Sequence, residues 1–187
     1  MTARFALALL LILFTAAIAP SQSSDVKPAI LVVDSAKISA SDFTNQNLKF
    51  LVTAAETAGQ MTVFESTEHP GFKTQWHSHP NCEETFYILE GTLTVKSGGK
   101  TYHAPAGSFV YIPRDTPHGQ GNFTDKPTRF ITTFTPGGAE IFFRDRERIM
   151  KDLKPTDPAY AARLEEARQK NKFWVNPLGT WEPDTKP

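Results

Sequence analysis

The chain has 187 residues, of which 40% are hydrophobic and 21% are charged, so it can form one folded domain with a core of its own. Its 20 basic and 20 acidic residues give zero net charge, which argues against the broad basic surface used to bind nucleic acid or anionic lipid. Fourteen phenylalanines and fourteen prolines favour a β-rich fold with many turns over a helical bundle.

Residues 1–21 are expected to be a signal peptide. Arg4 supplies a positive charge, and the almost unbroken apolar run at 5–18 is too short for a comfortable membrane span but has the length of a signal-peptide core. Small residues follow the run, and cleavage after Ala19 or after Ser21 are the two options, with an uncleaved anchor as the alternative. We therefore expect a secreted or periplasmic protein that has no membrane contact after cleavage.

Residues 22–59 are expected to form an N-terminal arm with strands at the edge of a sheet. Residues 22–28 are polar and indicate a flexible leader, whereas the apolar runs at 30–33 and 48–52 predict short strands. Residues 53–59 lack a strand pattern and indicate a turn. Because an exposed hydrophobic edge strand tends to pair with another chain, the run at 30–33 offers a route to a homodimer.

From residue 60 to residue 136, short β segments alternate with turn residues at the spacing typical of a β-sandwich or barrel. Strands are predicted at 61–65, 75–79, 84–89, 93–95, 101–103, 109–112 and 128–135. The sequence Ser97-Gly98-Gly99-Lys100 is a strong hairpin signal, and two prolines make Pro113–Pro117 a rigid loop. An all-β domain is therefore expected over this stretch.

Residues 137–187 have a different character and predict a helical tail. Residues 139–153 contain helix-forming residues with apolar side chains near helical spacing. A second helix is predicted from Asp157-Pro158 to about Lys172, with the aspartate as N-cap and the proline at the first helical position. We expect this pair of helices and the tryptophan-containing end that follows to serve packing, or as a lid, rather than chemistry.

Two histidines, a glutamate and a third histidine are spaced so that the fold can bring them together. His77 and His79 lie two residues apart, so an extended strand would direct both imidazoles to one side. Glu84 has the opposite parity, but Pro80-Asn81 breaks the strand and lets the chain re-enter with Glu84 facing inward. His118 follows the rigid loop and can return to the same interior. Imidazole and carboxylate together suit a divalent transition metal.

These residues belong to two spaced patterns that resemble the motifs of the cupin superfamily. The first pattern consists of Gly71, His77-Ser78-His79, Glu84 and Gly91. The second pattern consists of Gly107, Pro113, His118 and Asn122. Asp115 stands where the family usually has glycine, and aspartate is among the residues that best accept a left-handed backbone. The resemblance implies an all-β jelly-roll barrel over residues 60–136, with the pair of helices appended at its C-terminal side.

Carried over residue by residue, the resemblance implies that one metal ion is bound by His77, His79, Glu84 and His118. Glu83, one position away, is the alternative to Glu84. Such a set leaves coordination positions open, as catalytic sites do, and it suits Fe, Mn, Ni, Co, Cu or Zn without choosing among them.

Other conspicuous residues are expected to play structural roles. His69 and His103 fall outside both motifs, Cys82 is expected to pack in a turn rather than to act as a soft ligand, and the sequon at Asn122 is interpreted as a turn. Alternation predicts six side chains that line the barrel around the metal: Phe64, Trp76, Phe86, Ile88, Phe130 and Phe134.

The sequence says less about function than about fold, because proteins with the cupin fold catalyse many different reactions. The segment Phe134–Phe143 and the stretch 48–59 are similar to parts of quercetinase-like cupins. This resemblance implies a metal-dependent dioxygenase acting on a small hydroxylated aromatic compound, with Glu84 as the base that takes the hydroxyl proton. The alternatives are a non-redox metal-dependent isomerase or lyase, and a non-enzymatic protein that binds a small ligand or a metal.

Overall fold

The structure is a computed structural model of the chain, and it describes residues 29–181. The expected signal peptide and the polar leader at 22–28 lie outside the described residues. Among the described residues, no helix is both long enough and apolar enough to cross a membrane.

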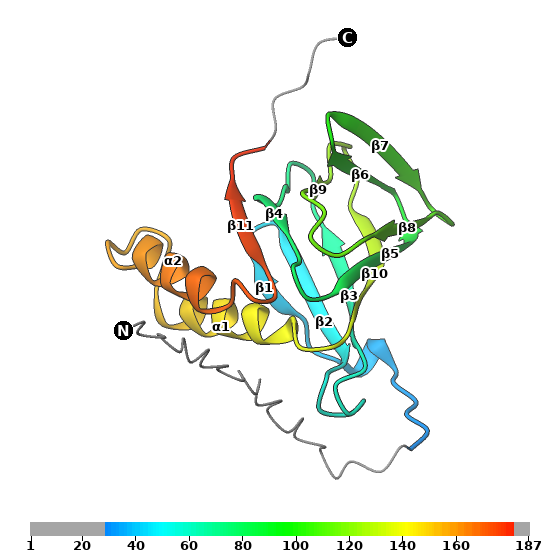
Figure 1. The fold of residues 1–187 in the computed structure, drawn as a ribbon, viewed down its shortest axis with the longest axis horizontal. Helices are drawn as coiled ribbons and strands as arrows, with labels where there is room; N and C mark the ends of the chain where they lie inside the picture. Colours follow the sequence, from blue (N-terminus) through cyan, green and yellow to red (C-terminus); the bar gives the residue numbers. More distant parts are fainter. Residues whose placement is uncertain (1–28, 182–187) are drawn as a thin grey trace, which may run out of the picture.

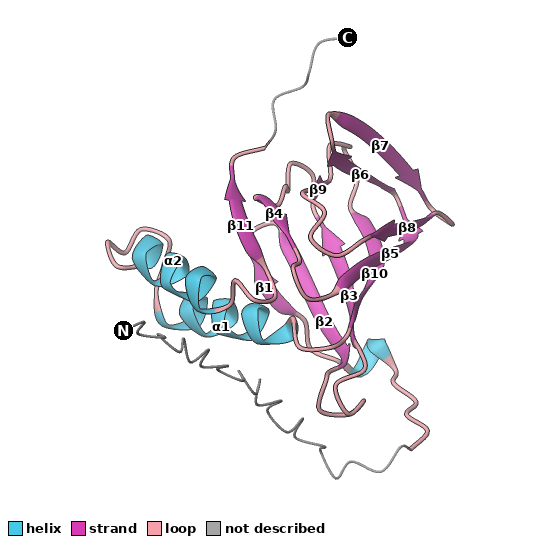
Figure 2. Ribbon diagram, viewed as in Figure 1, coloured by secondary structure: helices cyan, strands magenta, loops and turns pink. Residues whose placement is uncertain are grey.

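The described part of the chain is dominated by β-strands, with two helices near its C-terminal end (Figure 2). The strands are β1 (Ser41–Phe43), β2 (Gln46–Val52), β3 (Thr62–Glu68), β4 (Trp76–Ser78), β5 (Glu83–Glu90), β6 (Thr92–Ser97), β7 (Lys100–Pro105), β8 (Phe109–Ile112), β9 (Gly119–Gly121), β10 (Thr128–Thr135) and β11 (Asn176–Gly179). The helices are a 3-10 turn (Ser35–Lys37), α1 (Glu140–Asp152) and α2 (Tyr160–Lys170). This confirms the predicted jelly-roll class with a C-terminal pair of helices.

The strands form three sheets, which are not joined into one closed barrel by hydrogen bonds. The largest sheet has the order β1-β2-β3-β10-β5-β8, and β7-β6-β9 and β11-β4 form the two smaller sheets. In Figure 1, β4 and β9 lie across from the largest sheet, and α1 and α2 lie together beside β1 and β11. Neighbours in the sheets come from distant parts of the chain, as in the central pairing of β10 with β3 and β5.

Alternation along the central strands places apolar side chains in the interior. In β10 the buried residues include Phe130, Thr132 and Phe134, and they are separated by partly exposed ones. Two buried apolar clusters result. The first contains Phe43, Leu48, Phe50, Phe64, Cys82, Phe134 and Ala139. The second contains Phe86, Ile88, Leu93, Val95, Ala104, Ile112 and Phe130. Thr132 lies between the clusters on β10 and shares a hydrogen bond of 3.3 Å with Ser66 of β3.

The C-terminal helices are fixed to the sheet by polar contacts. Glu140, at the start of α1, accepts a hydrogen bond from the hydroxyl of Thr62 and another, of 2.9 Å, from the backbone N–H of Ala54. Asp145 of α1 accepts hydrogen bonds from Lys170 at 2.9 Å and from Asn171 at 3.0 Å, which join the two helices. The tail is therefore built onto the barrel.

The predictions about the strands were wrong or incomplete at four places. The run 30–33 is not a strand, and its side chains are exposed, with 97% of Ile30 accessible to solvent. The sheet edge is formed by β1, which was not predicted. The edge strand at 30–33 through which a homodimer was expected to form is therefore absent from the described structure. The strands β9 and β11 were not predicted, because the sequences Gly-Gln-Gly and Asn-Pro-Leu-Gly have weak strand propensity and depend on their partners β6 and β4.

Candidate metal centre

The two histidines of the first motif and the histidine of the second are brought together by the backbone. The N–H of His77 donates to the carbonyl oxygen of His118 at 2.9 Å, and the N–H of His118 donates to the carbonyl oxygen of His77 at 2.8 Å. This antiparallel bridge places the two imidazole rings with centroids 4.3 Å apart. His79 follows directly after β4, and its ring centroid lies 4.9 Å from that of His77.

Glu84 reaches the same space because the turn before β5 resets the alternation. In β5 the side chains of Glu84, Phe86 and Ile88 are buried, whereas Tyr87 is exposed. Glu83, the alternative ligand, points elsewhere and forms an ion pair of 2.9 Å with Arg114. The break expected at Pro80-Asn81 therefore has the predicted consequence, and the structure favours Glu84.

Asp115 explains how the second motif is held against the first. Its φ is 53°, the left-handed conformation that the family pattern usually assigns to glycine. The Asp115 N–H donates to the carbonyl oxygen of His79 at 2.9 Å, and its carboxylate accepts a hydrogen bond of 2.9 Å from the Ser78 hydroxyl. An aspartate at this position thus tolerates the backbone and also adds a contact to the strand that carries the histidines.

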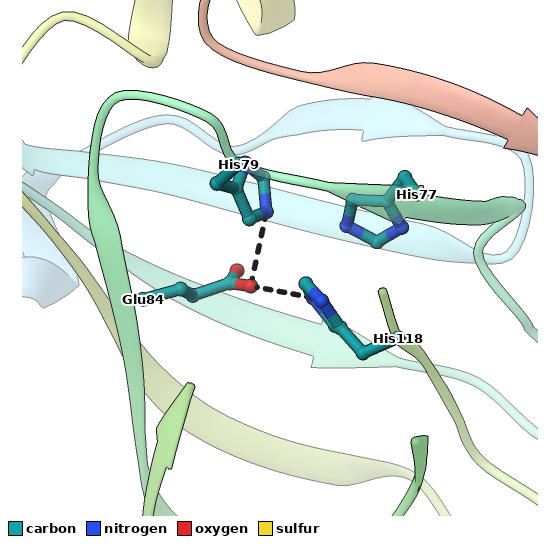
Figure 3. Close-up of side chains that lie close together, drawn as sticks. All are labelled: His77, His79, Glu84 and His118. Atoms are coloured by element: carbon teal, nitrogen blue, oxygen red, sulfur yellow. Dashed lines mark hydrogen bonds and ion pairs between the residues drawn. The ribbon is translucent and has the colours of Figure 1, made fainter. Parts of the chain in front are cut away.

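Figure 3 shows the four side chains gathered around one point. One potential ligand atom from each of His77, His79, Glu84 and His118 lies within 4.8 Å of all the others. Glu84 Oε2 lies 3.1 Å from His79 Nε2 and 3.0 Å from His118 Nε2. All four residues are at most 8% exposed. The predicted constellation is therefore present in the fold.

Each histidine is oriented by a hydrogen bond from its other ring nitrogen. The Nδ1 atoms of His77, His79 and His118 lie 2.8, 2.7 and 2.8 Å from the backbone oxygens of Gln75, Trp174 and Thr116, in that order. Because a carbonyl oxygen can only accept, each Nδ1 donates its proton to the backbone, and each Nε2 is the ring atom that faces the centre and would bind a metal ion. This arrangement is typical of metal-binding histidines.

The surroundings favour a neutral His77 and an ionised Glu84, the forms in which these residues bind metals. Burial, followed by the neighbouring His118 and His79, holds the pKa of His77 well below its usual value. Burial alone would raise the pKa of Glu84, but His79 and His118 outweigh it and lower that pKa. A lowered pKa makes Glu84 a weaker base, so this direction favours its role as a ligand.

The four residues fit a divalent transition metal. Nε2 of His79 is buried and makes no hydrogen bond of acceptable geometry, and its close charged neighbour is the Glu84 carboxylate at 3.1 Å. A cation among three neutral imidazole nitrogens and a carboxylate would satisfy this nitrogen and suit the donor set. Cys82 does not join them: it packs in the first apolar cluster, and burial together with the charge of Glu84 raises its pKa to about 12.

A cavity of about 170 Å³ opens beside the cluster. Its wall includes His77, His79 and Glu84, and it also includes residues from α1, α2 and the segment around β11. The lining residues contributed by this C-terminal part are Phe142, Phe143, Arg146, Arg168, Val175 and Pro177. The helical tail therefore forms one wall of the site, which agrees with the expected packing or lid role. The Trp174 carbonyl also orients His79, a contact that the sequence did not predict.

The predicted lining was correct only in part. Phe64 lines the cavity, and Phe134 packs its ring 4.9 Å from that of His79. Phe86, Ile88 and Phe130 belong to the second apolar cluster, and Trp76 pairs with Trp181. Alternation identifies which side chains face inward, but it cannot say how far along the barrel axis each one lies from the metal ligands.

Glu68, at the end of β3, was missed by sequence reasoning and is an unusual buried acid. It is fully buried, and neither carboxyl oxygen has a hydrogen-bond partner. Burial and then the charge of Glu84 raise its pKa well above the ordinary value, and the nearby amide of Gln120 offsets this only in part without reaching hydrogen-bond geometry. Glu68 is therefore expected to be an uncharged carboxylic acid in the folded protein.

Replacing Glu68 by glutamine is expected to stabilise the metal-free protein at pH 8, because glutamine cannot ionise and so removes the cost of keeping this buried acid protonated. The gain should be about 1.4 kcal/mol for each pH unit over which the acid is ionised in the unfolded chain but still protonated in the folded one. Since the folded-state pKa is raised, the wild type loses stability as the pH rises above the unfolded value of about 4.3. The gain should therefore shrink at pH 5. Urea unfolding at both pH values measures it. Glu65→Gln is the control: Glu65 lies on the same strand as Glu68 but pairs with Arg129, so this change should not stabilise the protein. An equal gain in stability for Glu68→Gln at both pH values would contradict the assignment of a raised pKa to Glu68.

Comparisons with known proteins agree with this geometry. A family described as "Cupin domain" matches residues 64–134. Quercetin 2,3-dioxygenase of Bacillus subtilis is 32% identical over 102 residues, which are 54% of this chain and 30% of that protein. Polyketide synthase CurC of Streptomyces cyaneus is 33% identical over 85 residues, which are 46% of this chain and 54% of that protein. The matched part therefore spans between 30% and 54% of the length of these relatives.

A solved structure shows the same fold. The polyketide cyclase RemF from Streptomyces resistomycificus superposes with a TM-score of 0.52 and 22% sequence identity, over 57% of this chain and 80% of that one. At this identity the similarity shows the architecture alone.

Proposed function

Because residues 64–134 of this chain are a cupin domain that resembles the quercetinase-like cupins, we propose that the protein is a metal-dependent dioxygenase acting on a small hydroxylated aromatic compound. The observation that carries the proposal is the buried cluster of His77, His79, Glu84 and His118 beside a cavity lined by aromatic rings. The similarity to quercetin 2,3-dioxygenase supports the reaction class.

One set of residues would bind the metal ion, and another set would contact the substrate. The Nε2 atoms of the three histidines and the carboxylate of Glu84 would hold a divalent ion. When bound, such an ion supplies a Lewis acid and a template with open coordination positions. The rings of Phe64, Phe142 and Phe143 offer an apolar wall against which an aromatic substrate can pack.

Proton transfer from the substrate is assigned to Glu84. Its Oε2 faces His79 and His118, which leaves Oε1 as the oxygen that would accept the proton of a substrate hydroxyl. The lowered pKa makes this carboxylate a weaker base in the absence of substrate. Closer approach of the substrate, by displacing water from the cavity, would raise the pKa toward the range that proton transfer needs. We also propose that residues 1–21 direct export of the protein.

Oxygen consumption is the direct test of the reaction class. Purified protein is loaded separately with Fe, Mn, Ni, Co, Cu or Zn and incubated with a panel of catechols, hydroxybenzoates and flavonols, while an oxygen electrode and mass spectrometry follow the reaction. We expect at least one metal to support uptake of one O₂ for each substrate cleaved. Turnover that persists without O₂ would instead assign the non-redox isomerase or lyase, and metal binding without turnover of any compound would assign a binding protein.

A further inference from the structure

Positive charge is concentrated on the cavity wall although the chain as a whole is neutral. Three cationic side chains line the cavity, Lys73, Arg146 and Arg168, and among the described residues the only acid that does so is the metal-cluster residue Glu84. A bound divalent ion would add further positive charge. The cavity is therefore electrostatically suited to an anion, and this property does not follow from the overall composition.

Arg146 of α1 is the most informative of the three. It is partly buried, and its guanidinium carbon lies 4.8 Å from the ring centroid of Phe43 and 5.6 Å from that of Phe142. Within the described part of the chain it makes no ion pair with a carboxylate. Burial, followed by the charge of Arg168, lowers its pKa to about 10. A guanidinium held over aromatic rings without a counter-ion carries an energetic cost that a bound anion would remove.

Among the arginines of α1, only Arg146 lacks a carboxylate partner in the described structure. Arg144 pairs with Glu147 at 3.1 Å, and Arg148 pairs with Asp145 at 2.9 Å. Arg168, on α2, is 24% exposed in its side chain and pairs only with the exposed Glu165 at 3.3 Å. The helices thus neutralise their outward-facing charges and direct two guanidinium groups to the cavity.

The size of the cavity limits the ligand. Its volume of about 170 Å³ is below the 300–1,000 Å³ typical of pockets for drug-sized molecules. A three-ring flavonol would fill or exceed such a space, whereas a single ring with short substituents fits. Guanidinium groups pair best with planar carboxylates, which accept two parallel N–H bonds.

We propose that the substrate of this site is a single-ring hydroxylated aromatic carboxylate, whose carboxylate pairs with Arg146 and Arg168 while its hydroxyl end faces the histidine and glutamate cluster. This inference rests on the proposed function for the hydroxyl end, but the anion subsite itself depends only on the α1 and α2 arginines. A polar group recognised at one end and a reacting group at the other would fix the orientation of the ring in the cavity.

Binding, measured separately from turnover, tests the subsite. Calorimetric titration of the zinc-loaded protein compares 3,4-dihydroxybenzoate with 1,2-dihydroxybenzene, which differ by the carboxylate alone, and adds benzoate, which lacks the hydroxyls. We expect the dihydroxybenzoate to bind about ten- to a hundredfold more tightly than its neutral counterpart, the range for a charge-assisted bond in a partly buried site. Arg146→Met should remove most of this preference, because it should weaken binding of the dihydroxybenzoate far more than binding of the neutral diol.

Matched variants separate the subsite from general effects on folding or charge. Arg148→Met removes an outward-facing arginine from the same helix and should keep the preference, as should Arg163→Met on α2. Arg146→Lys should retain part of it. If Arg146→Met does not fold, the subsite is still tested by the loss of the carboxylate preference in Arg168→Met and by the two affinities of the wild type. Equal affinities of wild type for acid and diol would overturn the subsite.

The subsite and the proposed reaction can fail independently. If carboxylates bind through Arg146 but no metal supports O₂ uptake, the subsite stands and the dioxygenase assignment fails. If neutral catechols are oxidised as fast as their carboxylates and Arg146→Met has no effect on either, the dioxygenase assignment stands and the subsite fails.

Discussion

His118→Ala is expected to abolish metal binding, with a loss of affinity greater than about 100-fold, because even changes behind a ligand cost 10- to 100-fold. The side chain is fully buried, its Nδ1 is held by the carbonyl of Thr116, and no other histidine can take its place beside Glu84. After dialysis against a weak chelator, elemental analysis should find about one metal ion per wild-type chain and almost none per variant chain.

Thermal unfolding provides the second readout for His118→Ala. A saturating metal should raise the melting temperature of the wild type, since a ligand at 100 times its Kd stabilises by about 2.7 kcal/mol. The variant should show no such rise. His103→Ala is the matched control, because His103 lies on β7 and contacts Thr94 rather than the cluster. A variant that keeps stoichiometric metal would remove His118 from the ligand set.

Glu84→Gln is expected to keep part of the metal affinity and to lose turnover by about 10²- to 10⁴-fold, the usual contribution of a positioned acid or base. Glutamine has the same shape and can still offer its carbonyl oxygen to the metal, but it cannot accept a proton from a substrate hydroxyl. The measurement is the rate constant of O₂ uptake at saturating metal and substrate, together with the metal content of the same preparation.

The neighbouring acid Glu83 gives a matched control for Glu84→Gln. Glu83→Gln changes the adjacent residue, whose carboxylate pairs with Arg114 on the outer side of the strand, and should leave both metal content and turnover close to wild type. Full turnover in Glu84→Gln would show that another group takes the proton. Loss of all metal in that variant would show that the carboxylate is needed to hold the ion, and would leave the role of base without support.

Most of the barrel could be predicted because its strands are encoded locally. Alternation along 128–135 predicted β10 at the residues observed, and Ser97-Gly98-Gly99-Lys100 predicted the turn between β6 and β7. The metal cluster could also be predicted, because His77 and His79 share a strand face and a proline-containing turn resets the parity before Glu84. Strand alternation and turn formation depend mainly on neighbouring residues, so they can be recognised in the sequence.

Predictions failed where pairing between distant segments outweighs local preference. Residues 30–33 are rich in β-branched residues but find no neighbouring strand, so they remain exposed. Residues 176–179 include a proline and a glycine, yet they form β11, which pairs with β4 from a distant part of the chain. Propensity is a weak guide in such cases, since tertiary contacts decide whether a strand can complete its hydrogen bonds.

The amino-acid sequence was enough to predict an all-β domain from its periodicity, and its two spaced motifs implied the jelly roll and the four ligands through their resemblance to the cupin family. The surroundings of those ligands became known only from the three-dimensional fold. The fold places the carbonyl oxygen of Trp174 beside Nδ1 of His79. It turns Glu83 away from the cluster toward Arg114, and it buries Glu68 without a hydrogen-bond partner. It also directed Arg146 from a C-terminal helix into the cavity. These relations join residues far apart in the chain, and no local pattern encodes the distance between them.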